Sequence, residues 1–518
     1  MTRKTVGIAS LVWGVSILLS RLIGLIRESV IGRTLGGSAE ADAYWTAFVL
    51  PDFLNYLLAG GALSIVFIPI FSRHINDGRT EDAWLSFSVI SSWVTALVIC
   101  LTGLAWWATP TLTNYIAPGI QGANQTLLIE LIRIILPAQI FHLTGGLISA
   151  TLQARDKHLL PALAPLVYTG SIILGGLLLG PSLGAKGFAW GVLVGSVLGP
   201  FGLPLAGALK DGLKWQACFR HQHPDLKRYV LLSIPVMLGF SIVVFDDMLI
   251  KHFGSLLPEG AISRLQYAKT LMKVPMGVFG LAVGVASYPT LARLFGQDNT
   301  VEAKRLMLDA LCGIFVLALL ANAALASVGT EIAAVIWGRT RFSPEALSEI
   351  GLLTAFMGLG LWAWSGQVLV ARGFYAMGDT WTPTIMGSVM TLAAIPVYEL
   401  LAETHGSAGL ALASGAAVSI YLVGLFMLFG RRVGYVRADY MRLSVVLTKM
   451  AIAATASVKA IVFARAYIDV SGWSDLSRGM LFGILSIALT VSFALLLRVS
   501  EVTAIGQRLL KRVRRRLG

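Results

Sequence analysis

Residues 41–73 read ADAYWTAFVLPDFLNYLLAGGALSIVFIPIFSR, a long apolar segment that nevertheless carries ionisable residues. A second segment, residues 267–293, reads YAKTLMKVPMGVFGLAVGVASYPTLAR and has the same character. Each ends in a short proline-to-arginine stretch, residues 69–73 in the first and 289–293 in the second. Charge within a bilayer costs roughly 2.5–3.5 kcal/mol per residue on insertion scales, so it is retained mainly where it faces a polar cavity. The pair therefore indicates a duplicated membrane protein with a charged interior, which is typical of transporters.

The composition supports this class. Hydrophobic residues make up 56% of the 518 residues and charged residues only 13%, which no soluble domain of this size could accommodate. The net charge of +14 does not indicate nucleic-acid binding, because the basic residues lie mostly in short loops and in a tail from Arg498 onward. Cys100, Cys218 and Cys312 lack the spacing of a disulfide framework or metal site. We expect no metal and no cofactor.

The hydropathy pattern predicts an all-α polytopic membrane protein with about 14 transmembrane helices. The first apolar run has no convincing cleavage site, so we interpret it as a retained helix. The segment 331–337 is too short to span and is predicted to be an interfacial or re-entrant turn. The expected spans are 6–32, 41–72, 83–108, 126–153, 160–180, 184–209, 229–254, 264–292, 304–328, 348–374, 381–402, 406–430, 441–466 and 479–498.

The loops carry an orientation signal. With the N-terminus inside, the inner segments hold roughly three times as many Lys and Arg residues as the outer ones, which predicts cytoplasmic N- and C-termini. We therefore expect a multi-pass protein of the bacterial cytoplasmic (inner) membrane.

Short motifs also recur at a nearly constant offset. Gly184-Ala-Lys-Gly187 corresponds to Gly406-Ser-Ala-Gly409, and Pro161 corresponds to Pro383. The offset contains six spans, so we expect two parallel lobes related by an axis along the membrane normal, with the substrate path between them. The predicted organisation is an N-terminal lobe (1–213), a cytoplasmic linker (214–227), a C-terminal lobe (228–432), two additional helices (433–498) and a polybasic cytoplasmic tail (499–518).

Cations within the spans are the first candidates for chemistry. Arg21 and Arg27 lie on one broad side of the first helix, where they could bind an anion in a central cavity. Arg27 could instead reach the outer headgroups, whereas Arg21 is deeper in the span. Lys269 and Lys273 are four residues apart and repel each other unless an anion neutralises them. A bound diphosphate would do so, but nearby aspartates could also do so.

Carboxylates in the spans are the second group. Asp247 could pair with Lys251, which leaves Asp246 as a candidate for proton or sodium coupling. Glu130 and Arg133 are three residues apart and are predicted to form a salt bridge. Nucleotide-binding, metal-binding and nucleophilic-serine motifs are lacking in the sequence, so an enzyme is not indicated.

Several of these segments resemble the MurJ/MviN family, within the superfamily of multidrug, oligosaccharidyl-lipid and polysaccharide exporters. SRLIGLIRE resembles the first helix of the family, ADAYWTAFVLP and AGGALSIVFIP its second, YAKTLMKVPMGVFGLAVGVASYPTLAR its eighth, and RGFYAMGDTWTP the turn after its tenth. The resemblance implies a flippase for lipid II, the undecaprenyl-diphosphate-linked peptidoglycan precursor. It further implies that cavity cations receive the headgroup and that the two additional helices form a groove for the polyprenyl tail.

The resemblance also suggests site residues. Arg21, Arg27 and Asp42 match positions of functional importance in the family. Asn55 (or Tyr56) and Thr270 stand where the family usually has arginine, while Lys269 and Lys273 bring charge to neighbouring places. The expected substrate-binding set is therefore Arg21, Arg27, Asp42, Asn55, Lys269 and Lys273, with Asp246 and Asp247 as coupling candidates.

The expected function is alternating-access transport of a polyprenyl-diphosphate-linked glycan, with lipid II as the expected substrate and with coupling to membrane potential, Na⁺ or H⁺. Membrane lipids and a cell-wall synthesis complex are the expected partners, and nucleic acid is not. The alternatives are a flippase for another polyprenyl-linked glycan, a cation-coupled drug antiporter and a scaffold that transports nothing.

Overall fold

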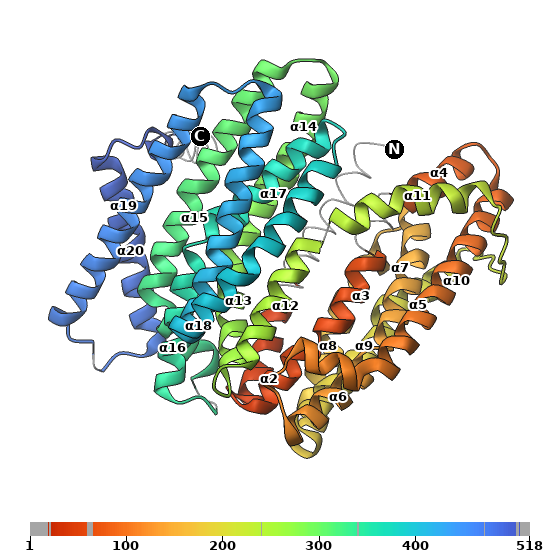
Figure 1. Ribbon diagram of the computed structural model, residues 1–518, viewed down its shortest axis with the longest axis horizontal. Coiled ribbons are helices and arrows are strands. Elements are labelled where there is room, and N and C mark those ends of the chain that lie inside the picture. The colour runs from red at the N-terminus through yellow and green to blue at the C-terminus, as the bar shows by residue number, and fades with distance from the viewer. Residues whose placement is uncertain are drawn as a thin grey trace, which may run out of the picture. The chain divides into compact units, whose positions relative to one another are not determined.

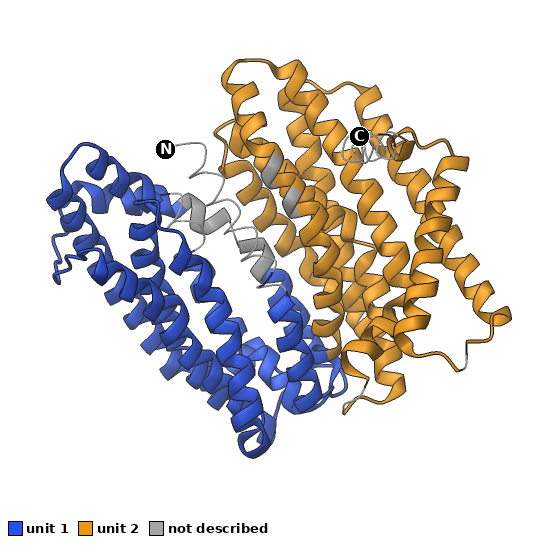
Figure 2. Ribbon diagram, turned by 180° about the vertical axis from the view of Figure 1, so that it is seen from behind, with its two compact units in different colours: residues 1–263 blue, residues 264–518 orange. Residues whose placement is uncertain are grey.

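The computed structural model describes residues 19, 22–59, 66–239, 241–338, 341–470, 472–503 and 507. No β-strand occurs among these residues, and most of them lie in helices. The chain forms two compact units, Met1–Ser263 and Arg264–Gly518, shown in different colours in Figure 2. The all-α architecture expected from the sequence is confirmed.

Unit 1 contains the N-terminal helices (Figure 1). Residues 22–35 are helical. The elements that follow are α2 (Ala39–Thr46), α3 (Val49–Ala59), α4 (Ile68–Asn76), α5 (Thr80–Ile116), α6 (Gly122–Ile135), α7 (Ala138–Gln153), α8 (Leu159–Leu183), α9 (Ala185–Ser196), the π-helical turn η2 (Val197–Gly202), α10 (Leu203–Lys210), α11 (Pro224–Gly239) and α12 (Ser241–Ser255).

Small residues determine how closely some of these helices pack. A Cβ atom at Gly175 of α8 would lie 2.6 Å from the carbonyl oxygen of Gly187 in α9, and one at Gly191 would lie 2.7 Å from that of Ser171. The two backbones can approach this closely only because these residues are glycine, as is common where membrane helices pack.

Unit 2 contains the C-terminal helices, and α13 (Ala261–Met276) runs across the boundary between the units. Its other elements are η3 (Gly277–Leu281), α14 (Ala282–Gly296), α15 (Thr300–Trp337), α16 (Pro344–Gly358), α17 (Leu361–Ala376), α18 (Trp381–Val433), α19 (Arg437–Tyr467) and α20 (Asp475–Leu496). Pro275 lacks the N–H that would continue the α-helical hydrogen-bond ladder, and the π-helical turn η3 begins two residues after it.

Length and composition identify membrane-spanning helices. Eight helices of the described residues are long and apolar enough to cross a bilayer, and α16 with α17, bent by 42°, makes a ninth if the pair is one span. Two of the expected spans, 381–402 and 406–430, both lie within α18, whose residue Gly406 has a non-helical conformation. The multi-pass class is therefore confirmed, and the number of 14 remains a prediction.

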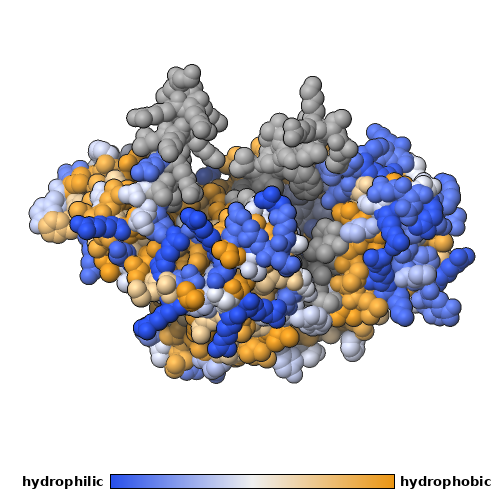
Figure 3. Space-filling model, turned by 90° about the horizontal axis from the view of Figure 1, so that it is seen from above, coloured by the Kyte–Doolittle hydropathy of each residue, from blue (hydrophilic) through white to orange (hydrophobic). Residues whose placement is uncertain are grey.

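The surface fits a membrane environment. Large apolar side chains on the candidate spans are exposed, including Leu178 (73%), Leu392 (68%) and Ile484 (68%). Exposed apolar surface on this scale marks contact with lipid or with another protein. Figure 3 shows one end of the molecule, where hydrophilic residues are gathered beside hydrophobic ones.

Two boundaries differ from the sequence-based expectation. The segment 331–337 is not a turn: α15 continues helically to Trp337, after a kink at Val328, whose φ is −132°. The helix continues because side chains on α19 and α20 pack against it, as described below. The linker 214–227 is non-helical up to His223, but the compact units divide after Ser263, so α11 and α12 belong to unit 1.

The internal repeat is visible in the backbone. Gly184 (φ 56°, ψ −130°) and Gly406 (φ 57°, ψ −135°) have nearly identical conformations at corresponding positions of the two halves. Left-handed conformations are rare, so their recurrence at matching places is informative. The other matching residues with positive φ are Gly36 and Gly260, Gly78 and Asp298, Asp156 and Gly378, and Gly212 and Gly434.

Gly406 offers a direct test of this conformation. Gly406→Ala should destabilise the fold by about 1–3 kcal/mol, because its φ and ψ lie in a region that glycine alone adopts readily. An added Cβ there meets no atom within 4 Å, so the cost is one of backbone strain. Gly184→Ala should cost more, because its Cβ would also lie 2.1 Å from Glu40 Oε1. Thermal unfolding in detergent measures both effects.

Gly313 provides the matched control. It lies within α15, and an added Cβ there also meets no atom within 4 Å. Gly313→Ala should be neutral or stabilise by up to about 1 kcal/mol, because alanine favours the helix. Equal melting temperatures for Gly406→Ala and Gly313→Ala would show that the turn at Gly406 imposes no strain.

Candidate functional site

Arg27 is paired with its neighbour in the helix of residues 22–35. Its Nη2 atom donates to Glu28 Oε1 over 2.6 Å. The Glu28 side chain is 4% exposed and that of Arg27 28% exposed, so the cation keeps an accessible edge. Arg21, the other candidate on this helix, lies outside the described residues.

Asp42 is buried in α2, and both of its carboxylate oxygens accept hydrogen bonds from backbone N–H groups. Gly260 N donates to Oδ2 over 2.6 Å, and Ser263 N donates to Oδ1 over 2.7 Å. These N–H groups stand at the N-terminal end of α13, where backbone donors have no partner within the helix and a negative charge is favoured. In this structure Asp42 therefore stabilises the start of the helix that later carries Lys269 and Lys273.

Lys269 and Lys273 lie one turn apart on α13 but differ in burial. Lys269 is 3% exposed, and its Nζ atom lies 5.7 Å from the ring centroid of Trp364 on α17, within the range of a cation–π contact. Lys273 is exposed. An added Cβ at Gly280, in the following turn η3, would lie 2.7 Å from Ser365 Cα, so this part of unit 2 packs directly on α17.

The other predicted site residues lie on α3 and α12 of unit 1. Asn55 is half-buried on α3. Asp246 is buried and Asp247 half-buried on α12, and Lys251, one turn further on, is also buried. Because α12 packs against α3, the structure places the Asp246 and Asn55 helices side by side. A cluster of ionisable groups in an apolar helix pair is expensive and suggests function.

The predicted ion pair between Glu130 and Arg133 is wrong. Glu130 Oε2 instead lies 2.5 Å from Lys186 Nζ, on α9, which packs against α6. The Arg133 guanidinium lies 4.5 Å from the ring centroid of Trp106. The spacing within α6 allowed an intrahelical pair, but packing between helices offered each charge a better partner.

The structure reveals a polar cluster around Arg465 that the sequence analysis did not identify. Arg465 Nη1, on α19, lies 2.6 Å from Glu331 Oε1, and Nη2 donates to the Ser327 carbonyl oxygen over 2.6 Å. The guanidinium also lies 4.5 Å over the ring of Phe482 on α20. Because the kink at Val328 interrupts the ladder of α15, Arg465 binds a carbonyl next to the interruption. In the sequence, the one indication of this cluster is an arginine near the end of an apolar span.

Serine side chains extend this attachment. Ser327 Oγ donates to Ser486 Oγ over 3.0 Å, and Ser457 Oγ donates to the Ser486 carbonyl oxygen over 2.9 Å. These bonds join α15, α19 and α20, so the two additional helices are fixed to unit 2 by polar contacts as well as by apolar packing. Lys459, another cation on α19, is exposed.

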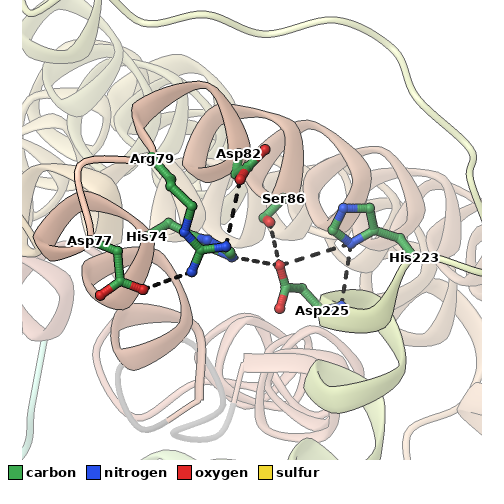
Figure 4. Close-up of polar contacts among 7 residues, drawn as sticks. All are labelled: His74, Asp77, Arg79, Asp82, Ser86, His223 and Asp225. Atoms are coloured by element: carbon green, nitrogen blue, oxygen red, sulfur yellow. Dashed lines mark hydrogen bonds and ion pairs between the residues drawn. The ribbon is translucent and has the colours of Figure 1, made fainter.

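A second polar cluster joins α4, α5 and α11 in unit 1 (Figure 4). Asp225 Oδ2 accepts from Ser86 Oγ over 2.5 Å and lies 2.8 Å from His74 Nε2. His223 Nδ1 is 3.9 Å away. Partial burial acts to raise the pKa of Asp225, but the bonds from Ser86 and His74 lower it below its ordinary value. The carboxylate therefore stays ionised at neutral pH and holds the start of α11.

These features define a class of protein. An all-helical multi-pass membrane fold with a buried lysine and a buried aspartate on broken spans is that of a membrane transporter rather than of an enzyme. The model of the lipid II flippase MurJ family matches residues 31–473, most of the length, and the chain belongs to that family. The family resemblance seen in the sequence is thus confirmed.

Individual relatives agree with this assignment. The lipid II flippase MurJ of Burkholderia cenocepacia is 29% identical over 426 residues, which cover 79% of this chain and 81% of the relative. The probable lipid II flippase MurJ of Synechocystis sp. is 26% identical over 547 residues, covering 99% of this chain and 98% of the relative.

Solved structures show the same fold. A lipid II flippase MurJ in an inward closed conformation has a TM-score of 0.76 at 22% identity, over 93% of this chain and 98% of that one. An inward-facing multidrug resistance MATE transporter of the MOP superfamily has a TM-score of 0.67 at 16% identity, over 80% of this chain and 94% of that one. Both solved structures therefore share the fold of this chain.

Proposed function

We propose that this protein flips lipid II from the inner to the outer leaflet of the bacterial cytoplasmic membrane for peptidoglycan synthesis. The family match over residues 31–473 carries this proposal. The relatives that match over about four fifths or more of their length bear the same activity in their names. The transport step requires no bond to be made or broken.

The diphosphate of the substrate is bound in this proposal by Lys269 and Lys273 with the two arginines of the first helix. Lys269 is held against Trp364, whereas Lys273 is exposed and free to move to an anion. Arg27 can exchange its bond to Glu28 for one to phosphate. The membrane potential favours outward movement of an anionic headgroup by about 2.3 kcal/mol per charge per 100 mV.

Other residues support this step. Asp42 acts as a positioning residue through its bonds to the start of α13, and Asn55 lies on α3 beside the helix of Asp246 and Asp247. These two carboxylates are the groups proposed to couple transport to Na⁺ or H⁺. The two additional helices, α19 and α20, accommodate the polyprenyl tail along their apolar exterior, as the family resemblance implies.

A second candidate substrate is another polyprenyl-diphosphate-linked glycan. The observation that favours it is the presence of Asn55 and Thr270 where the family resemblance expects arginine. Replacement of two cations changes where the glycan phosphate can bind without removing the cationic character that Lys269 and Lys273 provide.

Complementation in cells tests the proposal. In a strain whose own lipid II flippase can be switched off, expression of this chain should restore growth and lipid II exposure at the outer leaflet. Rescue of growth without lipid II exposure would contradict transport and favour a scaffold. If neither growth nor lipid II exposure is restored, but another polyprenyl-linked glycan is exported, the result would support the second candidate.

The proposed topology predicts which loops are accessible. In a cysteine-free background, Ala123→Cys should react with a membrane-impermeant maleimide in intact spheroplasts, and Asn76→Cys should react only after permeabilisation. Both positions are exposed in the structure, so burial does not limit labelling. We expect this result because the loops on the same side of the membrane as Asn76 carry an excess of basic residues, which is typical of the cytoplasmic side. Labelling of both from one side would rule out this topology.

A further inference from the structure

The linker that precedes α11 is fixed to α5 although it is not helical. Ser88, Ser91 and Ser92 on α5 are all buried, and each accepts a hydrogen bond from the linker. The bonds run from Trp215 Nε1 to Ser91 Oγ (2.9 Å), from Gln216 N to Ser88 Oγ (3.2 Å) and from Cys218 N to Ser92 Oγ (2.9 Å). These bonds therefore hold the linker in a defined position on the surface of unit 1.

This fixed linker presents aromatic side chains outward. Trp215 is 53% exposed and Phe219 54% exposed. The Phe219 ring packs edge-on against Trp93 of α5, with 5.5 Å between centroids, and Trp93 is itself 38% exposed. Tryptophan and other amphipathic aromatic side chains are enriched where a membrane protein meets the headgroup region.

The same region carries exposed cations. Arg220, Lys227 and Arg228 are exposed and form no ion pair within the part of the chain that the structure describes. The acidic residue between them, Asp225, is engaged by Ser86 and His74. The surface therefore has positive charge that an external anion can neutralise.

An apolar cavity of about 400 Å³ opens beside these cations. Its walls come from three helices: Leu58 of α3, Leu97 of α5, and Val230 and Ile234 of α11. His221 of the linker also lines it. Lys227 precedes Ile234 by seven residues, which places it within about 20° of the same helix face and two turns nearer the linker. Lys227 is therefore expected at the end of the cavity that is nearer the linker, and Arg220 directly precedes His221 of the lining.

We propose that this cavity binds an acyl chain of an anionic phospholipid of the phosphatidylglycerol type, whose phosphate is held by Arg220, His221 and Lys227. The charge complementarity decides the lipid class, because a zwitterionic headgroup would leave the cluster unneutralised. The aromatic side chains of Trp215 and Phe219 lie at headgroup depth in this arrangement. The site lies wholly within unit 1 and is separate from the transport site proposed above.

Spin-labelled lipids test this proposal with the full-length protein in phosphatidylcholine vesicles. The fraction of motionally restricted phosphatidylglycerol should exceed that of phosphatidylcholine for the unaltered protein. The triple variant Arg220→Gln, Lys227→Gln, Arg228→Gln should lose most of this preference, as should Val230→Trp, which fills the cavity. Raised salt should also weaken it, since exposed charges are screened.

The matched control neutralises three exposed cations elsewhere, Arg305→Gln, Arg431→Gln and Arg437→Gln, and should retain the preference. Equal loss in the control, or no loss in the linker triple variant, would overturn the site. Undecaprenyl phosphate that displaces the restricted lipid more strongly than phosphatidylglycerol would also overturn it, by assigning the cavity to a substrate tail. Thermal unfolding of each variant verifies that the fold is intact, and the charge variant keeps the test decisive if Val230→Trp does not fold.

Discussion

Lys273→Gln is expected to reduce lipid II flipping by about tenfold or more, equivalent to at least about 1.4 kcal/mol of lost interaction with the substrate. Expression and thermal stability should be unchanged, because Lys273 is exposed and its removal from a like-charged pair with Lys269 relieves repulsion. Flipping of labelled lipid II in proteoliposomes measures the loss, and headgroup binding should fall in parallel.

Lys210→Gln is the matched control for this prediction. Lys210 is also an exposed lysine, at the end of the apolar helix α10, and it lies outside both the proposed diphosphate site and the helices proposed to hold the tail, so flipping should be unchanged. A poorly expressed Lys273→Gln variant that is restored by Asp246→Asn would contradict the substrate role and make the lysine a counter-ion. Asp42 is a weaker candidate for that role, because both of its oxygens accept backbone hydrogen bonds.

Arg465→Met is expected to destabilise unit 2 by about 3 kcal/mol, because it leaves the buried carboxylate of Glu331 without its ion-pair partner. This is the lower end of the range for such pairs, since the Arg465 side chain is itself 35% exposed. The variant also loses the bond to the Ser327 carbonyl oxygen beside the kink in α15. Apparent melting temperature and protease cleavage between α19 and α20 provide the measurements.

A second substitution identifies the cause. Adding Glu331→Gln to Arg465→Met should recover much of the stability, because the unpaired charge is then removed. Arg465→Lys should be intermediate, since lysine keeps the charge but lacks the fork that reaches Glu331 and Ser327 together. A melting temperature of Arg465→Met equal to that of the unaltered protein would show that the two additional helices do not depend on this contact.

Much of the architecture could be predicted because it depends on local pattern. Apolar runs separated by basic loops identify a polytopic membrane protein from hydropathy alone. The correspondence of Gly184 with Gly406 could be recognised in the sequence because both positions have a backbone conformation that favours glycine.

Contacts between helices could not be predicted in the same way. Glu130 had a partner of opposite charge three residues away, and only the packing of α6 on α9 shows that Lys186 is closer. The serines that fix the linker to α5 look like ordinary polar residues of a helix, because their partners, two backbone N–H groups and the Trp215 indole N–H, are more than 120 residues away in sequence. The sequence shows which residues within the spans are ionisable. It does not show which of them are buried, because burial depends on how the helices pack.

Flipping of labelled lipid II by the purified protein in liposomes tests the central claim most directly. Proteoliposomes should expose lipid II from the opposite leaflet faster than protein-free liposomes or liposomes containing Lys273→Gln, and an inside-negative potential should change the rate in the direction that moves the anionic headgroup outward. A rate equal to that of protein-free liposomes, with protein that is folded and correctly inserted, would contradict the account.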